Sequence, residues 1–167
     1  MFRIGLGHDT HRLVESNGTD GSGIILGGIR IEHNKQLLGH SDADVVLHAI
    51  TDALLGAAGL EDIGQLFPDT AAENRGKDSS EMLASAWQKV RQSGWSIVNL
   101  DTIIFAQRPK IAPYKEAMRK HIAAVLEIEP EQVSVKGKTG EHIGIIGREE
   151  AISAECIVLL SKNSTVE

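Results

Sequence analysis

An aspartate and a histidine two residues apart on an expected strand, Asp9 and His11, constrain the fold of this 167-residue chain most. Alternate residues of a strand face the same side, about 6–7 Å apart, so both side chains can aim at one point. His48, from the helix expected next, completes a set of two imidazoles and one carboxylate. This set suits Zn²⁺, and three protein ligands leave the fourth tetrahedral position open, as at catalytic zinc sites. The pattern therefore predicts a metal site shared by a strand and a helix.

A second cluster supports the metal site, because His40, Asp44 and His48 follow one another at intervals of four residues. A helix that begins near Ser41 places them on one face. Asp44 then has two alternative roles, which the sequence leaves open: it caps the helix, or it orients His48 through a hydrogen bond. His40 precedes the helix N-terminus, where unpaired amides and the helix dipole favour an anion.

Hydrophobic periodicity and turn residues predict the remaining elements. We expect strands over 2–13, 24–26, 29–31, 95–106, 133–136 and 151–160, and helices that start near 41, 78 and 113 and end before 59, 94 and 130. Gly27-Gly28 is a hairpin signal, and 60–74 is expected to be a mobile surface loop. The expected fold is α+β, a mixed four-stranded sheet with helices packed on one face plus a small β-hairpin, in a single domain over 1–167.

The charge and cysteine content exclude several classes of protein. A net charge of −6 and a pI near 5.6 argue against general binding to nucleic acid or to an anionic membrane surface. The single Cys156 cannot form an intrachain disulfide and is most simply a buried small hydrophobe, which fits a reducing compartment. No hydrophobic run is long enough to span a bilayer, and no basic-then-apolar leader is present. We therefore expect a cytoplasmic protein.

Two later loops carry groups that suit a nucleotide. Segment 136–141 joins two lysines, the Thr139 hydroxyl and the Glu141 carboxylate, and this mixture suits phosphate with a divalent ion held by Glu141. The order of a phosphate-binding P-loop is missing, so this segment alone is weak evidence. Segment 106–113 is an extended loop with two prolines whose backbone can wrap a planar base.

Four motifs occur in order along almost the whole chain: Gly5–His11, Gly39–His48, Asp62–Asp69 and Gly147–Arg148. Together they resemble the 2-C-methyl-D-erythritol 2,4-cyclodiphosphate synthase family, which forms a cyclic diphosphate in non-mevalonate isoprenoid (terpenoid) biosynthesis. The resemblance implies a lyase that assembles as a homotrimer, with an active site in each cleft between neighbouring chains.

The resemblance also implies a role for each matching residue. Asp9, His11 and His48 match the ligands of one Zn²⁺ per subunit, and Glu141 matches a ligand of a second divalent cation, Mg²⁺ or Mn²⁺. His40 and Thr139 match the catalytic groups that stabilise the transition state. The residues implied to bind the substrate are Asp9, Thr10, His11, His40, Ser41, Asp62, Ile63, Gly64, Phe67, Pro68, Asp69, Thr70, Ala71, Ala106, Gln107, Arg108, Pro109, Lys110, Ile111, Ala112, Lys138, Thr139, Gly140, Glu141, Ile145 and Arg148.

The implied substrate is a cytidine diphosphate, 4-diphosphocytidyl-2-C-methyl-D-erythritol 2-phosphate. Its own 2-phosphate attacks the β-phosphorus and expels cytidine monophosphate, while two cations neutralise the oxygens around that phosphorus. The chain departs from the family pattern at Lys138 and Gly140, where hydroxyl residues are common, and at Ile145, where an aromatic is frequent. The change at Ile145 weakens the case for an isoprenoid diphosphate in the trimer channel beside Arg148 and Glu155.

Two other classes of function compete with this reading. A zinc-dependent phosphohydrolase would use the same three ligands with a water at the open position, and with Asp44 or Asp69 as the base. A non-catalytic isoprenoid-diphosphate-binding protein would use the trimer channel and Arg148 and keep the metal as a structural ion.

Overall fold

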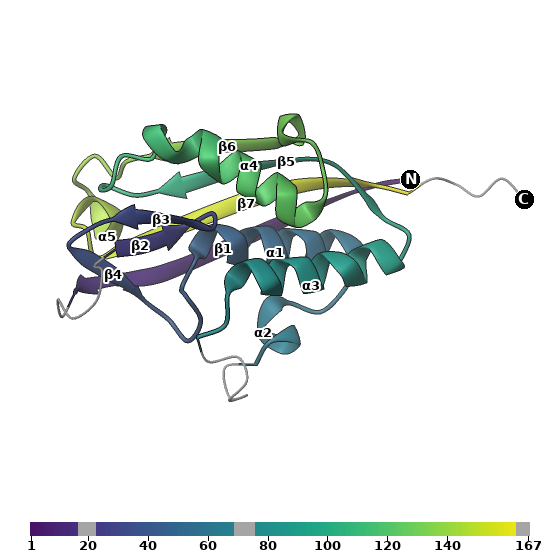
Figure 1. The fold of residues 1–167 in the computed structure, drawn as a ribbon, viewed down its shortest axis with the longest axis horizontal. Coiled ribbons are helices and arrows are strands. Elements are labelled where there is room, and N and C mark those ends of the chain that lie inside the picture. Colours follow the sequence, from purple (N-terminus) through teal and green to yellow (C-terminus); the bar gives the residue numbers. More distant parts are fainter. Residues whose placement is uncertain (17–22, 69–75, 163–167) are drawn as a thin grey trace, which may run out of the picture.

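The computed structural model describes residues 1–16, 23–68 and 76–162, and it folds them into two sheets and five α-helices (Figure 1). The strands are β1 (Phe2–Glu15), β2 (Gly23–Leu26), β3 (Ile29–Glu32), β4 (Lys35–Leu38), β5 (Ser96–Phe105), β6 (Val133–Lys138) and β7 (Ala151–Ser161). The helices are α1 (Val45–Ala58), α2 (Ile63–Leu66), α3 (Ser79–Gln92), α4 (Lys115–Leu126) and α5 (Gly144–Gly147), with 3₁₀ turns at Ala112–Tyr114 and Pro130–Gln132.

The main sheet is mixed and has the strand order β4-β1-β7-β5-β6. Only β5 and β6 run parallel, whereas the other neighbouring pairs are antiparallel. The α+β class, the mixed sheet and the separate β2–β3 hairpin are confirmed, but the predicted count of four strands is wrong because β4 adds a fifth. Strand β4 has only four residues and no β-branched side chain, so its sequence carries little strand signal. It forms by pairing with the far end of β1, from Arg12↔Leu38 to Glu15↔Lys35.

Helix α1 packs directly on the backbone of β1, and two glycines permit the close approach. A Cβ added to Gly5 would lie 1.9 Å from the carbonyl oxygen of Ala53, and one added to Gly7 would lie 1.9 Å from that of Ala49. Both positions face the helix, because alternate residues of β1 share one side of the sheet. The same side then carries Asp9 and His11, so the glycines bring α1 against the strand that holds these two residues.

The helices cover one face of the main sheet (Figure 1). Helix α1 contacts β1 and β7 on one side and α3 on the other, and α4 contacts β6 and α3. Helix α1 is therefore the central core element, and the largest fully buried side chains among its residues are Leu47, Ile50, Leu54 and Leu55. The sequence-predicted buried stripe of α3, namely Met82, Leu83, Ala86, Trp87 and Val90, is confirmed.

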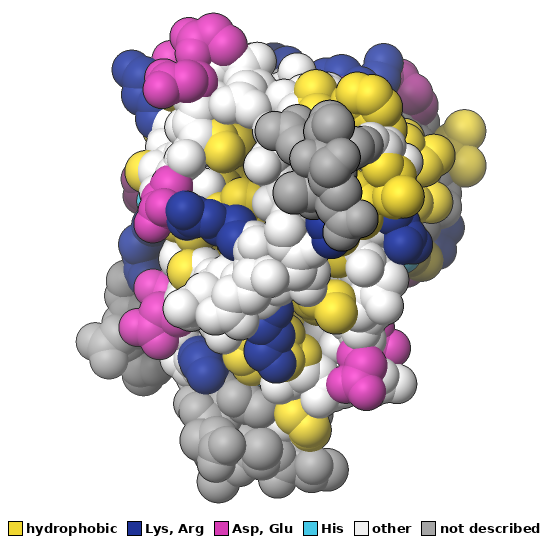
Figure 2. All heavy atoms as spheres, turned by 90° about the vertical axis from the view of Figure 1, so that its right-hand side faces the viewer, with side chains coloured by type: hydrophobic (Ala, Val, Ile, Leu, Met, Phe, Trp, Pro, Cys, Tyr) yellow, Lys and Arg dark blue, Asp and Glu magenta, His cyan; other side chains and the backbone are white. Residues whose placement is uncertain are grey.

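The opposite face of the sheet is not covered by the described part of the chain. Phe2, Ile4 and Leu6 of β1 are 67–74 % exposed, and Ile157, which pairs with Leu6 on β7, is 54 % exposed. Figure 2 looks onto the end of the molecule where β1 begins, and hydrophobic side chains gather at one edge of this view. Contiguous exposed apolar surface of this kind is typical of an interaction face. Among the described residues, no helix is both long and apolar enough to cross a membrane.

Two helix predictions require correction. Helix α1 begins at Val45 with Asp44 as its N-cap, not near Ser41, so His40 lies outside the helix and does not share its face with His48. The expected loop 60–74 contains the short helix α2, while its residues 69–74 lie outside the described residues. Asp62 is the N-cap of α2 and accepts a hydrogen bond from the backbone N–H of Gln65 at 2.9 Å. The hydrophobic periodicity of the surrounding sequence does not indicate this helix.

Candidate functional site

Asp9, His11 and His48 converge as the sequence predicts. One oxygen of Asp9 lies 2.9 Å from Nδ1 of His48 and 3.2 Å from Nε2 of His11. The two ring nitrogens lie 3.4 Å apart. One ligand atom from each of the three residues can therefore face a shared centre, and these atoms all lie within 4.8 Å of one another.

The spacing of the three atoms fits a tetrahedral zinc ion. Bonds of about 2.0–2.1 Å at tetrahedral angles put neighbouring ligand atoms about 3.3–3.4 Å apart. The observed separations of 2.9, 3.2 and 3.4 Å lie close to this edge length. Two nitrogens and one oxygen are also a donor set that zinc accepts. The three residues present in this chain therefore fit the implied metal.

The surroundings of His11 and Asp9 favour their metal-binding forms. Nδ1 of His11 lies 2.8 Å from the carbonyl oxygen of Leu38, which can only accept, so Nδ1 carries the proton and Nε2 presents a lone pair. Burial alone would raise the pKa of Asp9, but the hydrogen bonds and charges of His11 and His48 outweigh it and lower that pKa. Asp9 is therefore a carboxylate at neutral pH. The neighbouring Thr10 turns its side chain to the other face of β1 and contacts His8.

Asp44 is a cap and not a partner of His48, which resolves the alternative that the sequence left open. Its carboxylate accepts hydrogen bonds from the backbone N–H groups of Val46 and Leu47 at the start of α1 and of Gly27 and Gly28 in the hairpin. Burial raises the pKa of Asp44 to about 6, although the hydrogen bonds from Gly28, Gly27 and Leu47 oppose the shift. Asp44 thus ties the β2–β3 hairpin to the helix that carries His48.

The sequence did not predict the groups that contact Nε2, the second ring nitrogen of His48. Nε2 lies 2.9 Å from Oγ of Ser79 and 3.1 Å from Oγ of Ser41. Ser79 also hydrogen-bonds Asp42. Ser79 is 31 residues from His48 and meets it only because α3 packs on α1, so no local pattern could have indicated the contact.

The segment expected to bind the methylerythritol phosphate lies one turn of α1 beyond His48. Asp52 accepts a hydrogen bond from the backbone N–H of Ile63 at 2.8 Å and so fixes α2 to α1. Gly64 belongs to α2, and the buried Phe67 follows it, with the ammonium of Lys77 5.1 Å from its ring centre. Of the other expected contacts in this segment, Pro68 is exposed, whereas Asp69, Thr70 and Ala71 lie outside the described residues.

The two segments expected to hold cytidine diphosphate, 106–112 and 138–141, lie side by side. The backbone N–H of Ala106 donates to the carbonyl of Lys138 at 2.9 Å, which extends the parallel pairing of β5 and β6. A Cβ on Gly137 would lie 2.9 Å from Cβ of Ile111, so this glycine permits the loop to fold against β6. Beyond it, the Thr139 hydroxyl donates to the Glu141 carboxylate at 2.6 Å, and Gly140 separates the two.

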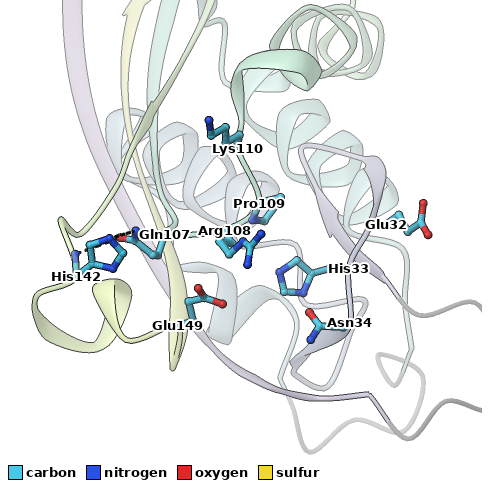
Figure 3. A pocket seen from close by; sticks show the side chains of 9 residues that line it. All are labelled: Glu32, His33, Asn34, Gln107, Arg108, Pro109, Lys110, His142 and Glu149. Carbon is cyan, nitrogen blue, oxygen red and sulfur yellow. Dashed lines mark hydrogen bonds between the residues drawn. The ribbon is translucent and has the colours of Figure 1, made fainter.

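A pocket of about 780 Å³ adjoins this segment (Figure 3). Gln107, Arg108, Pro109 and Lys110 supply one wall, and the remaining lining residues are Glu32, His33, Asn34, His142 and Glu149. In Figure 3 the Arg108 side chain lies between Glu149 and His33, while Gln107 contacts His142. Asp9, His11 and His48 do not line this pocket.

Two of the remaining expected residues lie near the start of β7. Arg148 forms an exposed ion pair with Glu150 at 2.7 Å, and Ile145 of α5 is 49 % exposed. Glu155 is exposed on β7 and pairs with His8 of β1. His40 and Ala112 are also exposed, and the carbonyl oxygen of His40 accepts a hydrogen bond from the backbone N–H of Gly76.

Comparison with known proteins gives one consistent family. The model of the YgbB family matches residues 2–161. A 2-C-methyl-D-erythritol 2,4-cyclodiphosphate synthase from Chromobacterium violaceum is 57 % identical over 97 % of this chain and 99 % of its own length. A synthase of the same name from Geobacillus thermodenitrificans is 53 % identical, over 98 % of this chain and 99 % of its own length.

Solved structures agree with the sequence relatives. The complex of IspF from Plasmodium falciparum with CDP superposes with a TM-score of 0.83 at 37 % identity, and covers 98 % of this chain and 97 % of its own. The bifunctional IspDF from Campylobacter jejuni superposes with a TM-score of 0.91 at 38 % identity. The match covers 98 % of this chain and 43 % of the longer IspDF chain.

Proposed function

Because this chain belongs to the YgbB family, we propose that it is the cyclising lyase of non-mevalonate isoprenoid biosynthesis. It converts 4-diphosphocytidyl-2-C-methyl-D-erythritol 2-phosphate to 2-C-methyl-D-erythritol 2,4-cyclodiphosphate and releases cytidine monophosphate. The observation that carries the proposal is the convergence of Asp9, His11 and His48 on one point, on a chain that matches the family over residues 2–161. The chain acts as a single catalytic domain over 1–167.

The metal ions are assigned from the donor groups. Asp9, His11 and His48 hold one Zn²⁺ per subunit, because two imidazoles and a carboxylate suit zinc and leave a position open. Glu141 holds a second divalent cation, Mg²⁺ or Mn²⁺, together with phosphate oxygens of the substrate. When bound, the two cations neutralise charge on the diphosphate and so reduce its repulsion of the attacking phosphate.

The protein groups position the two ends of the substrate. Segment 106–112 wraps the cytosine with backbone groups, and 138–141 contacts the diphosphate with the Lys138 ammonium and the Thr139 hydroxyl. The segment that begins at Asp62 holds the methylerythritol phosphate, and His40 stabilises charge on the reacting phosphate. Holding both ends of one molecule keeps the attacking phosphate close to the β-phosphorus. By comparison with other intramolecular reactions, this lowers the activation free energy by roughly several kcal/mol.

The complete site is divided between neighbouring chains of a homotrimer. The exposed apolar face of β1 and β7 supports this assembly, since Phe2, Ile4, Leu6 and Ile157 would otherwise remain in water. The pocket beside Arg108 and Lys110 does not contain the metal cluster, which is the arrangement expected when each half faces a different partner. A cyclic trimer of identical chains contains three equivalent interfaces and thus three sites.

Mixed trimers test the divided site. Asp9→Ala removes the zinc half of the site. Lys110→Asp removes the cytidine half, provided that this variant is inactive by itself. Equal amounts unfolded and reassembled together give mixed trimers in about three-quarters of cases, and about a quarter of all sites regain two intact halves. We expect cytidine monophosphate release to recover to about a quarter of the wild-type rate. No recovery, although mass measurement confirms mixed trimers, would place the whole site within one chain.

A zinc-dependent phosphohydrolase is the second candidate, because its metal ligands would be the same. It needs a base beside the open metal position, and Asp44 does not serve, since its carboxylate is fully buried and accepts backbone hydrogen bonds. Asp69 lies outside the described residues. The lyase is therefore the better-supported function. A cytoplasmic location stays a prediction from the sequence, and a non-catalytic isoprenoid-diphosphate-binding protein that uses the trimer channel and Arg148 stays an alternative.

A further inference from the structure

The two ring nitrogens of His48 lie in different surroundings. Nδ1 lies 2.9 Å from the Asp9 carboxylate, on the side of the metal cluster. Nε2 points away from the cluster and lies 2.9 Å from Oγ of Ser79 and 3.1 Å from Oγ of Ser41. A ring nitrogen binds a metal only through a lone pair, so the tautomer of His48 decides whether Nδ1 can serve as a ligand.

Asp42 determines where the proton of the Ser79 hydroxyl points. The carboxylate of Asp42 accepts a hydrogen bond from this hydroxyl and another from the backbone N–H of Ser79 at 3.1 Å. A carboxylate only accepts, and a hydroxyl has a single proton to donate. The Ser79 proton is therefore committed to Asp42, and the lone pairs of Oγ are the part of the hydroxyl that can face His48.

The Ser79 side of the ring favours one tautomer of His48. If Nε2 carries the proton, it donates to Ser79 at 2.9 Å, and Nδ1 keeps its lone pair for the metal position. The other tautomer would set two lone pairs against each other at that distance. Ser41 fits the Nε2–H tautomer, because its oxygen can accept from Nε2 while it also accepts from the backbone N–H of Ala43 at 3.2 Å. Without a metal, the Asp9 carboxylate opposes this choice, because it also only accepts, lies 2.9 Å from Nδ1 and favours a proton there.

We propose that Ser79 and Asp42 are positioning residues that stabilise the metal-binding tautomer of His48 against the preference of Asp9 for a proton on Nδ1. This inference rests on the proposed function in one respect, namely that Asp9, His11 and His48 hold the metal. Ser79 is not one of the three metal-binding residues and acts through His48. The Leu38 carbonyl has the same effect on His11, because it accepts the Nδ1 proton and leaves Nε2 for the metal.

The scaffold around the pair holds it in place. Ser79 is fully buried at the first position of α3, and Asp42 also accepts from the backbone N–H of Asp44 at 3.2 Å. The backbone N–H of Asp42 donates in turn to the carbonyl of Lys77 at 3.3 Å. The start of α3 is thus joined to the turn before α1 by main-chain as well as side-chain hydrogen bonds, which hold Ser79 beside His48.

The tautomer ratio of His48 in the zinc-free protein is the first test. Two-bond ¹H–¹⁵N spectra of the histidine rings distinguish Nε2–H from Nδ1–H, and the His48 signals are assigned by their loss in His48→Gln. We expect a larger Nε2–H fraction in the wild-type protein than in Ser79→Ala, in which the Asp9 acceptor at Nδ1 gains weight. An equal Nε2–H fraction in the two proteins would overturn the proposal.

The second test measures zinc affinity by competition with a chelator. Ser79→Ala should weaken zinc binding about 10-fold, and Ser41→Ala combined with Ser79→Ala about 100-fold, the usual range for losing the partner of a ligating histidine. The neighbouring Ser80→Ala is the matched control, because Ser80 contacts His121 and not His48, and it should keep wild-type affinity. Circular dichroism verifies the fold of each variant.

Wild-type affinity in a folded Ser79→Ala protein would contradict the proposal, and so would an unchanged His48 tautomer in that variant. These outcomes are distinct from a failure of the proposed function. A wild-type protein that binds zinc more tightly than Ser79→Ala but releases no cytidine monophosphate from the substrate would refute the reaction and leave the positioning role intact.

Discussion

Gly7→Ala tests whether the packing of α1 on β1 sets the metal geometry. The added Cβ would lie 1.9 Å from the carbonyl oxygen of Ala49 and 2.6 Å from the nitrogen of Ala53, whereas ordinary contact begins near 3.4 Å. Because the nearest atoms belong to the helix backbone, no side chain can rotate to make room. The helix must therefore retreat from the strand by about 1.5 Å, the difference between these two distances.

That retreat acts directly on the metal cluster. His48 precedes Ala49 on α1, and Asp9 follows Gly7 on the same side of β1, so the helix carries one ligand away from the other two. Metal–ligand bonds tolerate changes of about 0.2 Å, far less than the expected movement. Loss of a histidine's hydrogen-bonding partner costs about 10–100-fold in metal affinity, and displacement of a ligand costs more. We therefore expect zinc affinity to fall by more than about 100-fold.

Gly56→Ala is the matched control, since it adds the same methyl group to α1 with no atom within 4 Å of the new Cβ. Overpacking at Gly7 should lower the free energy of unfolding by about 1–3 kcal/mol. The control should raise it by about 0.5–1 kcal/mol and leave zinc affinity unchanged. Chelator competition and chemical unfolding measure the two quantities. A Gly7→Ala protein with wild-type zinc affinity would refute the link between this packing and the metal site.

Four further predictions concern individual groups. His48→Ala should lose zinc and nearly all activity while the fold persists, and metal analysis that finds equal zinc would contradict the ligand assignment. Glu141→Gln should weaken the dependence of the rate on added Mg²⁺ without removing the tightly bound zinc, so an unchanged Mg²⁺ titration would count against this role. The pKa of Asp44 rises from 3.8 to about 6 in the folded state, so the folded protein binds this proton more tightly than the unfolded chain does. The contribution of Asp44 to the free energy of unfolding should therefore decline as pH rises through that interval and stay constant above it. A carboxyl ¹³C titration of Asp44 near 3.8 would refute the upward shift of its pKa. Burial raises the pKa of Cys156 to about 12, so this thiol should resist alkylation in the folded protein at pH 8, and rapid alkylation would be inconsistent with its burial.

The elements that the sequence predicted well are those with strong local signals. Helix α3 follows its N-cap Asp78 and buries the predicted stripe, because its apolar residues recur at helical spacing over fourteen residues. Strand β1 runs two residues beyond its predicted end at Leu13 because those residues pair with β4. Strand β4 itself was not predicted, since its pairing with β1 is a tertiary event that four unbranched residues do not encode locally.

The same distinction holds for the site. Asp9 and His11 could be placed together from the alternation of a strand, and the structure brings His48 to them. The choice between the two roles of Asp44 needed the position of the hairpin, whose amides it binds. Ser79 had no signal at all, because its contact with His48 depends on how α3 packs against α1.

Turnover in H₂¹⁸O distinguishes cyclisation from hydrolysis, because the proposed reaction consumes no water. The wild-type protein is incubated with the cytidine diphosphate substrate, and both products are analysed by mass spectrometry and ³¹P NMR. We expect cytidine monophosphate and a cyclic diphosphate, neither containing ¹⁸O beyond a control without protein. Either ¹⁸O-labelled cytidine monophosphate or a linear bisphosphate with ¹⁸O would show that water attacks the diphosphate, and would contradict the assignment as a cyclising lyase.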